Sequence, residues 1–247
     1  MISSTFYVLF VLDNVGYEAF GLLLAVSFVL QAVLDYPSGV LGDWLGQRWI
    51  LAIAYVTYGL SYLVLMVATT FEYLLLVYLL GAIAGSQLSG ALQAWFDNNY
   101  KVCAEEVDPK REIYRVYLGK SNTILGLLGA CIFIIGGLFA TLIAREAVFL
   151  FQSIGMFVLT GLSIVFIKDF KGIVKPKKSM KNYFKLLGEG LHFSFSSRYM
   201  IFLIGSICVS SALWSIWGQM ILLPMYYGYT GSDMGASLFR FAAWILV

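Results

Sequence analysis

A short glycine-rich stretch holds the residues of this chain that are best placed to act together. Gly39, Gly42 and Gly46 recur at intervals of three and four, and Asp43 and Arg48 add one acid and one base. Glycine permits tight turns and close approach of neighbouring helices. A carboxylate at a helix end or beside an arginine is stabilised, yet the contact can still open. The pattern predicts a hinge with a charge latch, and the alternative is a simple loop that contains an acid–base pair.

Long apolar runs flank this stretch, so membrane helices must position it. Apolar residues make up 60% of the 247 positions and charged residues 12%, whereas soluble domains carry about 25% charged residues. A hydrocarbon core of about 30 Å needs roughly 20 helical residues. Spans are predicted at about 19–41, 50–69, 72–96, 118–141, 147–167 and 199–223. Shorter runs at 2–12 and 234–247 indicate a fragment of a longer protein, with a complete chain that has two re-entrant ends as the alternative.

The basic residues gather in alternate loops. Of the 16 lysines and arginines, 14 lie in or beside the loops that follow residues 41, 96 and 167. In the other set of loops the single base is Arg145, and the acids are Asp13, Glu18, Glu72, Glu146 and Asp233. The positive-inside rule places the basic loops, including the long central one, in the cytoplasm. We therefore expect a multi-pass protein of the cell membrane, and the basic excess gives no support for nucleic-acid binding.

The stretch 39–49 resembles the signature loop between the second and third helices of the major facilitator superfamily, G-x-L-A-D-R-x-G-R-K. The matching positions are Gly39, Leu41, Gly42, Asp43 and Gly46. Arg48 supplies a base, whereas Trp44 and Gln47 replace residues that are usually basic. Residues 35–39, Asp-Tyr-Pro-Ser-Gly, resemble the acid-x-Pro-Thr-Gly run of efflux-type members, and residues 89–97 resemble a run found in some members.

The resemblance implies an all-α, polytopic membrane protein with a six-helix bundle and the first helices of a second, truncated bundle. Residues 1–167 are expected to form the N-terminal bundle with an incomplete first helix. Residues 168–198 are expected to form a cytoplasmic amphipathic linker, and residues 199–247 helix 7 and part of helix 8. One helical face of the linker carries Met180, Tyr183, Phe184, Leu187 and Leu191. This face predicts a helix on the inner leaflet, either a tether or a lipid sensor.

Four charged residues are candidates for proton coupling or ion pairing. Asp35 lies at the inner end of a span, where an ionisable group is costly unless it is paired or hydrated. It is a candidate proton carrier, and equally a structural partner for Arg115 or Lys120. Asp97 ends another span, where a carboxylate opposes the helix dipole. We expect it to pair with Arg48, Arg115 or another cation. The resemblance to the family implies that Asp43 of this chain holds the cytoplasmic gate closed.

Several uncharged side chains within the spans are candidates for lining a substrate cavity. They are Gln87, Gln93, Asn122, Trp214, Trp217 and Gln219. Interhelical hydrogen bonding is an alternative for the glutamines, and packing or an interfacial aromatic belt is one for the tryptophans. Gly136-Gly137 matches part of an antiporter motif, but Ile132 and Phe133 occupy its Gly-Pro positions. Arg240, within the last apolar run, requires a partner or a wet cavity.

These features favour secondary active transport of a small solute by alternating access, driven by protons or another coupling ion and consistent with efflux. The chain has no Walker A run, no H-E-x-x-H and no G-x-S-x-G, and His192 is its single histidine. We therefore expect no enzyme activity, no metal and no cofactor, and the lipid bilayer and a small-molecule substrate as partners. The alternatives are a non-transporting membrane receptor or scaffold, and a decayed fragment with the same fold.

Overall fold

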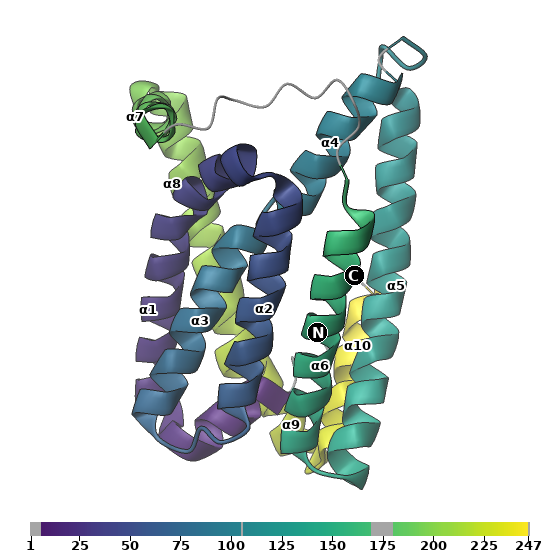
Figure 1. Ribbon diagram of the computed structural model, residues 1–247. Coiled ribbons are helices and arrows are strands. Elements are labelled where there is room, and N and C mark those ends of the chain that lie inside the picture. Colours follow the sequence, from purple (N-terminus) through teal and green to yellow (C-terminus); the bar gives the residue numbers. More distant parts are fainter. Residues whose placement is uncertain (1–5, 105, 169–179, 247) are drawn as a thin grey trace.

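The chain folds into helices joined by short connections in a computed structural model, which describes residues 6–104, 106–168 and 180–246 (Figure 1). The first helices are α1 (Phe6–Leu45), α2 (Gln47–Leu65), α3 (Phe71–Leu88), α4 (Ala91–Ala104), α5 (Glu112–Leu142) and α6 (Arg145–Phe166). They are followed by α7 (Met180–Ser196), α8 (Arg198–Ser215), the π-helix η1 (Ile216–Leu222), α9 (Leu223–Thr230) and α10 (Asp233–Leu246). Within these ranges no residue lies in a strand, which confirms the all-helical prediction.

In the part of the chain that the structure describes, six helical stretches are long and apolar enough to cross a membrane. They are Phe6–Gly42, Gln47–Leu65, Phe71–Ala104, Glu112–Leu142, Arg145–Phe166 and Arg198–Thr230. The prediction of a multi-pass membrane protein is therefore confirmed. The turn after α1, the connection after α4 and the helix α7 lie at one end of the molecule, which we call the basic end (Figure 1). The connections α2–α3, α5–α6 and α9–α10 lie at the opposite end, which we call the acidic end (Figure 1).

The first ten residues of α1 do not continue straight into the rest of the helix. Gly16 has φ 74° and ψ 179°, a conformation that is essentially restricted to glycine. The segment 6–15 before this bend lies across the acidic end of the molecule (Figure 1). Val8, Phe10 and Val11 on it belong to the same buried cluster as Tyr62 of α2. The apolar run that we expected to form part of a span therefore covers the ends of α2 and α3 instead.

The helices α1, α2, α3 and α6 pack into one group through serines and glycines. The hydroxyl of Ser61 donates to the carbonyl of Val77 at 3.0 Å, and that of Ser153 donates to the carbonyl of Gly59 at 2.8 Å. Ser38 donates to the carbonyl of Ser86 at 2.6 Å. In hydrocarbon, association depends on such close packing and interhelical hydrogen bonds rather than on the hydrophobic effect. These contacts make the four helices one unit.

A second group forms where α10 lies along α5 (Figure 1). A Cβ atom on Gly137 of α5 would lie 2.8 Å from the Cβ of Ser237 on α10, so only glycine allows this approach. α8 has no buried residue. α7 is seen end-on in Figure 1, nearly perpendicular to the spans, and the Tyr183 hydroxyl donates to the carbonyl of Pro37 at 3.4 Å. α7 lies within the predicted linker 168–198 and contacts the last part of α1, whereas residues 169–179 of that linker lie outside the described residues. The linker role stays a prediction.

Candidate functional site

The glycine-rich stretch is helical almost to its end. α1 continues through Pro37 and stops at Leu45, and α2 begins at Gln47, so Gly46 alone reverses the chain. Gly46 has φ 98°, a conformation that other residues rarely adopt. The loop that we predicted is therefore a one-residue turn. Pro37 lies inside α1.

Gly42 and Arg48, two further residues of the motif, make close contacts at this turn. A Cβ atom on Gly42 would lie 2.7 Å from the amide oxygen of Gln47, so the buried Gln47 side chain packs onto the bare backbone of α1. Arg48 lies over the ring of Trp49, 4.8 Å from its centroid. Gly39 is exposed and has no atom within 4 Å of where its Cβ would be. The side chain of Asp43 lies outside the described part of the structure, so its latch role stays a prediction.

Asp97 pairs with a cation that the sequence did not single out. Its carboxylate accepts from the Arg111 guanidinium at 2.9 Å, rather than from Arg48 or Arg115. Arg115 donates to the carbonyl of Lys110 at 3.3 Å. Asp35 and Lys120 are both exposed, and among the described residues no ion pair joins either of them to another side chain. The structural-partner alternative for Asp35 therefore finds no contact here, and its role as a proton carrier stays a prediction.

The α4–α5 connection is organised by Asp108, which we did not predict. This buried carboxylate accepts from the Tyr100 hydroxyl at 2.7 Å and from the backbone N–H groups of Glu112 and Tyr114 at 2.9 and 3.1 Å. It satisfies backbone donors at the start of α5, as an N-terminal cap does. In the sequence, Asp108-Pro109 is a turn-initiation signal shortly before a helix. The rings of Phe96, Tyr100 and Tyr114 pack around it.

The surroundings of Asp108 lower its pKa. Burial alone would raise the pKa of this carboxyl, but hydrogen bonds from Tyr100 and from backbone N–H groups outweigh burial and hold the pKa below its ordinary value. Because the ordinary value is about 4, the charged carboxylate stabilises the fold above that pH. The contribution is lost as the pH falls through the folded-state pKa.

We predict that Asp108→Asn lowers the melting temperature of the detergent-solubilised protein at neutral pH, because the amide cannot accept three charge-assisted hydrogen bonds. The difference from the wild type should shrink as the pH falls below about 4, where the wild-type carboxylate itself becomes protonated. Thermal unfolding followed by circular dichroism across this range measures both effects. The exposed neighbour Glu106→Gln is the control, and an unchanged melting temperature in Asp108→Asn would contradict the capping role.

The six cavity candidates do not converge in the described part of the chain. Gln93, Asn122, Trp214 and Trp217 are exposed. Gln87 and Gln219 are half-buried, and the buried side-chain oxygen of Gln87 has no hydrogen-bond partner among the described residues. Among the described residues no hydrogen bond or ring contact joins any two of the six. Their role in binding a substrate stays a prediction.

Trp217 and Gln219 lie in an irregular part of the last long span. Residues 216–222 form a π-helix, and Pro224 follows in the first turn of α9. Proline lacks the N–H that would donate to the carbonyl four residues before it, and its ring clashes with that carbonyl. The wider π-turn avoids this conflict. Such turns within α-helices often occur at functional sites, and Met220 of this one reaches within 3.6 Å of where a Gly21 Cβ would lie.

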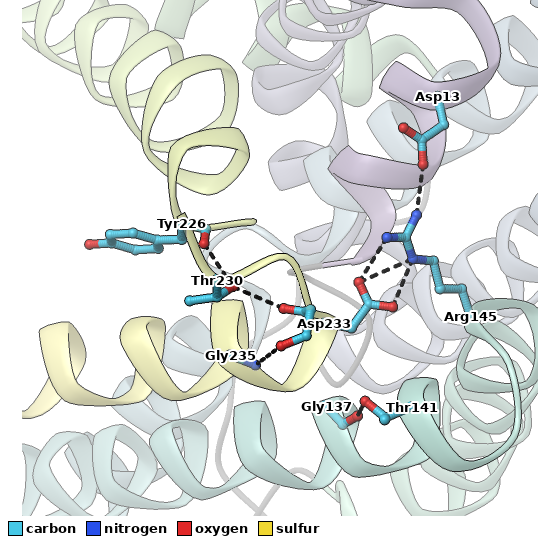
Figure 2. A network of polar contacts seen from close by, with 9 residues as sticks. Asp13, Gly137, Thr141, Arg145, Tyr226, Thr230, Asp233 and Gly235 are labelled. Atoms are coloured by element: carbon cyan, nitrogen blue, oxygen red, sulfur yellow. Dashed lines mark hydrogen bonds and ion pairs between the residues drawn. The ribbon is translucent and has the colours of Figure 1, made fainter. Parts of the chain in front are cut away.

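A charge cluster at the acidic end joins three segments that are distant in the sequence (Figure 2). The Arg145 guanidinium donates to both carboxylate oxygens of Asp233, at 2.8 to 3.2 Å, and to Asp13 at 2.7 Å. It also lies over the ring of Tyr227, 5.2 Å from its centroid. The sequence places these charges in loops at one membrane face, but their pairing was not predicted. We call Asp13, Arg145 and Asp233 the charge cluster below.

No family model, curated protein or solved structure matches the chain.

Among the described residues no group of three or more His, Cys, Asp or Glu side chains is arranged to hold a metal ion. What remains are two ends of a helical assembly with different chemistry. The basic end has a glycine turn and the Asp97–Arg111 pair, and the acidic end has the charge cluster.

Proposed function

We propose that this chain belongs to a secondary transporter that moves a small solute across the cell membrane by alternating access. One observation carries the proposal. Two groups of helices pack against each other around Phe6, Ala140 and Val148, and charges from both groups are paired at one end. α1, α2, α3 and α6 form one group and α5 with α10 the other, and Arg145 of α6 binds Asp233 of α10. Charge pairs between packed groups of helices can break and re-form, which is what alternating access requires.

The motif residues supply the second line of support. The turn at Gly46 and the Gly42–Gln47 contact bring the ends of α1 and α2 together without intervening loop residues. The resemblance to the major facilitator superfamily implies that Asp43 and Arg48, beside this turn, hold the basic end closed. The excess of basic residues at this end makes it the cytoplasmic end. We assign the cytoplasmic gate to this turn and the coupling of protons to Asp35.

The proposal is tested by flux in proteoliposomes that contain the purified protein, a pH-sensitive dye and one solute at a time from a panel of labelled small molecules. The wild type should catalyse saturable counterflow of at least one solute. Asp43→Asn should reduce that counterflow more than about tenfold, because a charge-assisted contact at the gate is lost. Asp35→Asn should abolish solute-driven proton movement and leave counterflow intact.

Glu146→Gln is the matched control, since it removes an exposed acid that is not part of the proposed machinery. Wild-type flux in both Asp43→Asn and Asp35→Asn would remove their assigned roles. If Asp35→Asn retains proton movement, Asp35 is not the proton carrier. If the wild type moves no solute of the panel and no protons, the transport proposal itself is wrong.

A further inference from the structure

The charge cluster has a geometry that distinguishes it from an ordinary surface ion pair. The guanidinium of Arg145 contacts Asp233 through two nitrogens and Asp13 through a third (Figure 2). The side chains of Arg145 and Asp233 are 18% and 15% exposed, whereas Asp13 is 66% exposed. Bidentate contacts between arginine and a carboxylate are the strong and directional type of charge pair. The pair between α6 and α10 is therefore a firm contact, and the contact to Asp13 is an outer one.

Two of the three charges lie where their own helix disfavours them. Arg145 is the first residue of α6, and a cation at a helix N-terminus opposes the helix dipole. Asp13 lies near the C-terminal end of the segment 6–15, where an anion is equally disfavoured. Asp233 begins α10, where an anion is favoured, and Ser232 caps that helix by accepting from the N–H of Gly235 at 3.0 Å. Pairing offsets the cost of the two misplaced charges.

The segment that carries Asp13 is connected to the rest of α1 through a glycine-only bend. Gly16 has φ 74° and ψ 179°, and no atom lies within 4 Å of where its Cβ would be. The segment covers the ends of α2 and α3 at the acidic end, as described above. A rotation at Gly16 would move the whole segment, and Asp13 with it, away from Arg145. Hinges are commonly a few residues that absorb such changes in backbone angles.

Polar groups lie behind the cluster along one face of α10. Asp233, Ser237 and Arg240 are spaced at i, i+4 and i+7, which places them on the same side of the helix. The hydroxyl of Ser237 is fully buried without a hydrogen-bond partner in the described part of the chain, against Gly137 of α5. The Arg240 guanidinium lies 4.6 Å from the centroid of the Phe133 ring. A polar file of this kind inside a membrane marks a route for water or solute.

From these observations we infer that Asp13, Arg145 and Asp233 form an ion-pair gate at the acidic end, with Gly16 as the hinge of its outer part. The inference rests on the proposed transport function and adds the second gate that alternating access requires. When Arg145 holds both carboxylates, the end is closed and Ser237 is sealed from solvent. When Arg145 releases Asp233, the start of α10 is no longer held to α6, and a shift of α10 against α5 makes Ser237 accessible from that side.

Cysteine labelling tests the gate independently of transport. In a background with Cys103, Cys131 and Cys208 changed to serine, Ser237→Cys reports access behind the cluster, and Ala54→Cys, fully buried in α2, reports unfolding. A membrane-impermeant maleimide is added to each side of reconstituted vesicles in turn. Arg145→Gln should raise the labelling rate of Ser237→Cys from the acidic side roughly tenfold. It should leave Ala54→Cys unlabelled. Arg145→Lys should give an intermediate rate, and Glu146→Gln the original one.

Each other outcome overturns the gate. Unchanged labelling of Ser237→Cys in Arg145→Gln would mean that the cluster seals nothing. If the labelling rates of Ser237→Cys and Ala54→Cys rise equally, the cluster only stabilises the fold, and its loss unfolds the chain. Failure of the transport proposal looks different, because the wild type would then move no solute while Arg145→Gln still opened Ser237→Cys. If flux is present but labelling is unchanged, the gate alone is wrong.

Discussion

Asp233→Asn should lower the free energy of unfolding by about 3 kcal/mol, the low end of the range for removing one member of a largely buried ion pair. The substitution leaves the Arg145 guanidinium, 18% exposed and at the unfavourable end of its helix dipole, without its bidentate partner. Asp13 remains beside Arg145, so the arginine is not left wholly unpaired. Unfolding of the protein in mixed detergent micelles, followed by the loss of helical circular dichroism, measures the change.

The cluster offers its own controls for this prediction. Asp13 is 66% exposed and makes a single contact, so Asp13→Asn should cost less than about 1 kcal/mol, as exposed ion pairs do. Glu146→Gln should cost nothing measurable. Equal losses for Asp13→Asn and Asp233→Asn would contradict the division of the cluster into a firm inner pair and a weak outer contact.

Gly137→Leu should separate α10 from α5 and destabilise the fold by about 1–3 kcal/mol or more, the usual cost of forcing a larger side chain into a packed contact. Even the first added carbon would lie 2.8 Å from the Cβ of Ser237 and 3.1 Å from the sulfur of Met234. The backbone of α10 must move to relieve both contacts. The same unfolding measurement applies, and transport should fall with stability because α10 carries Asp233.

Gly129→Leu is the matched control on the same helix. No atom lies within 4 Å of where a Gly129 Cβ would be, so a leucine there enters open space and should not destabilise α5. If Gly129→Leu and Gly137→Leu cost the same, the loss at Gly137 does not arise from its contact with α10.

The membrane helices were predictable from the sequence because their signal is local. Twenty or so apolar residues in a row have few alternatives to a span, and the stretches at 47–65, 145–166 and 198–230 overlap the predicted runs closely. The segment 6–15 was harder, because an apolar run of half the membrane thickness does not specify its direction. Its position across α2 and α3 depends on the bend at Gly16, and a glycine alone does not reveal which backbone angles it adopts.

For the glycine-rich stretch, the sequence predicted where the motif lies but not its local structure. Its three glycines suggested a loop, but one glycine is enough to reverse the chain. Gly46 has the positive φ, Gly42 provides space for Gln47, and Gly39 is exposed on a helix. A pattern of residue types cannot distinguish these three roles, because each depends on what packs against the backbone.

The charge cluster was beyond sequence reasoning for a different reason. Arg145 was identified as the single base among the loops of the acidic end, and Asp13 and Asp233 as acids of the same loops. Their pairing joins residues 132 and 88 positions apart, and it depends on how α1, α6 and α10 pack. Asp97 presents the same difficulty on a smaller scale, since the choice of Arg111 over Arg48 or Arg115 depends on the path of the α4–α5 connection.

In the proposed transport cycle the two ends of this assembly open alternately. The most direct test compares two single cysteines in the cysteine-free background. They are Ser237→Cys behind the charge cluster and Gln87→Cys in α3, beside Leu88, which packs in the same cluster as Leu41 and Leu45 of α1. Impermeant maleimide is applied from the side each one faces. On introducing Arg145→Gln, we predict that labelling of Ser237→Cys rises while labelling of Gln87→Cys falls, because opening one end closes the other. A rise at both positions, or a rise at Ser237→Cys with no change at Gln87→Cys, would contradict alternating access.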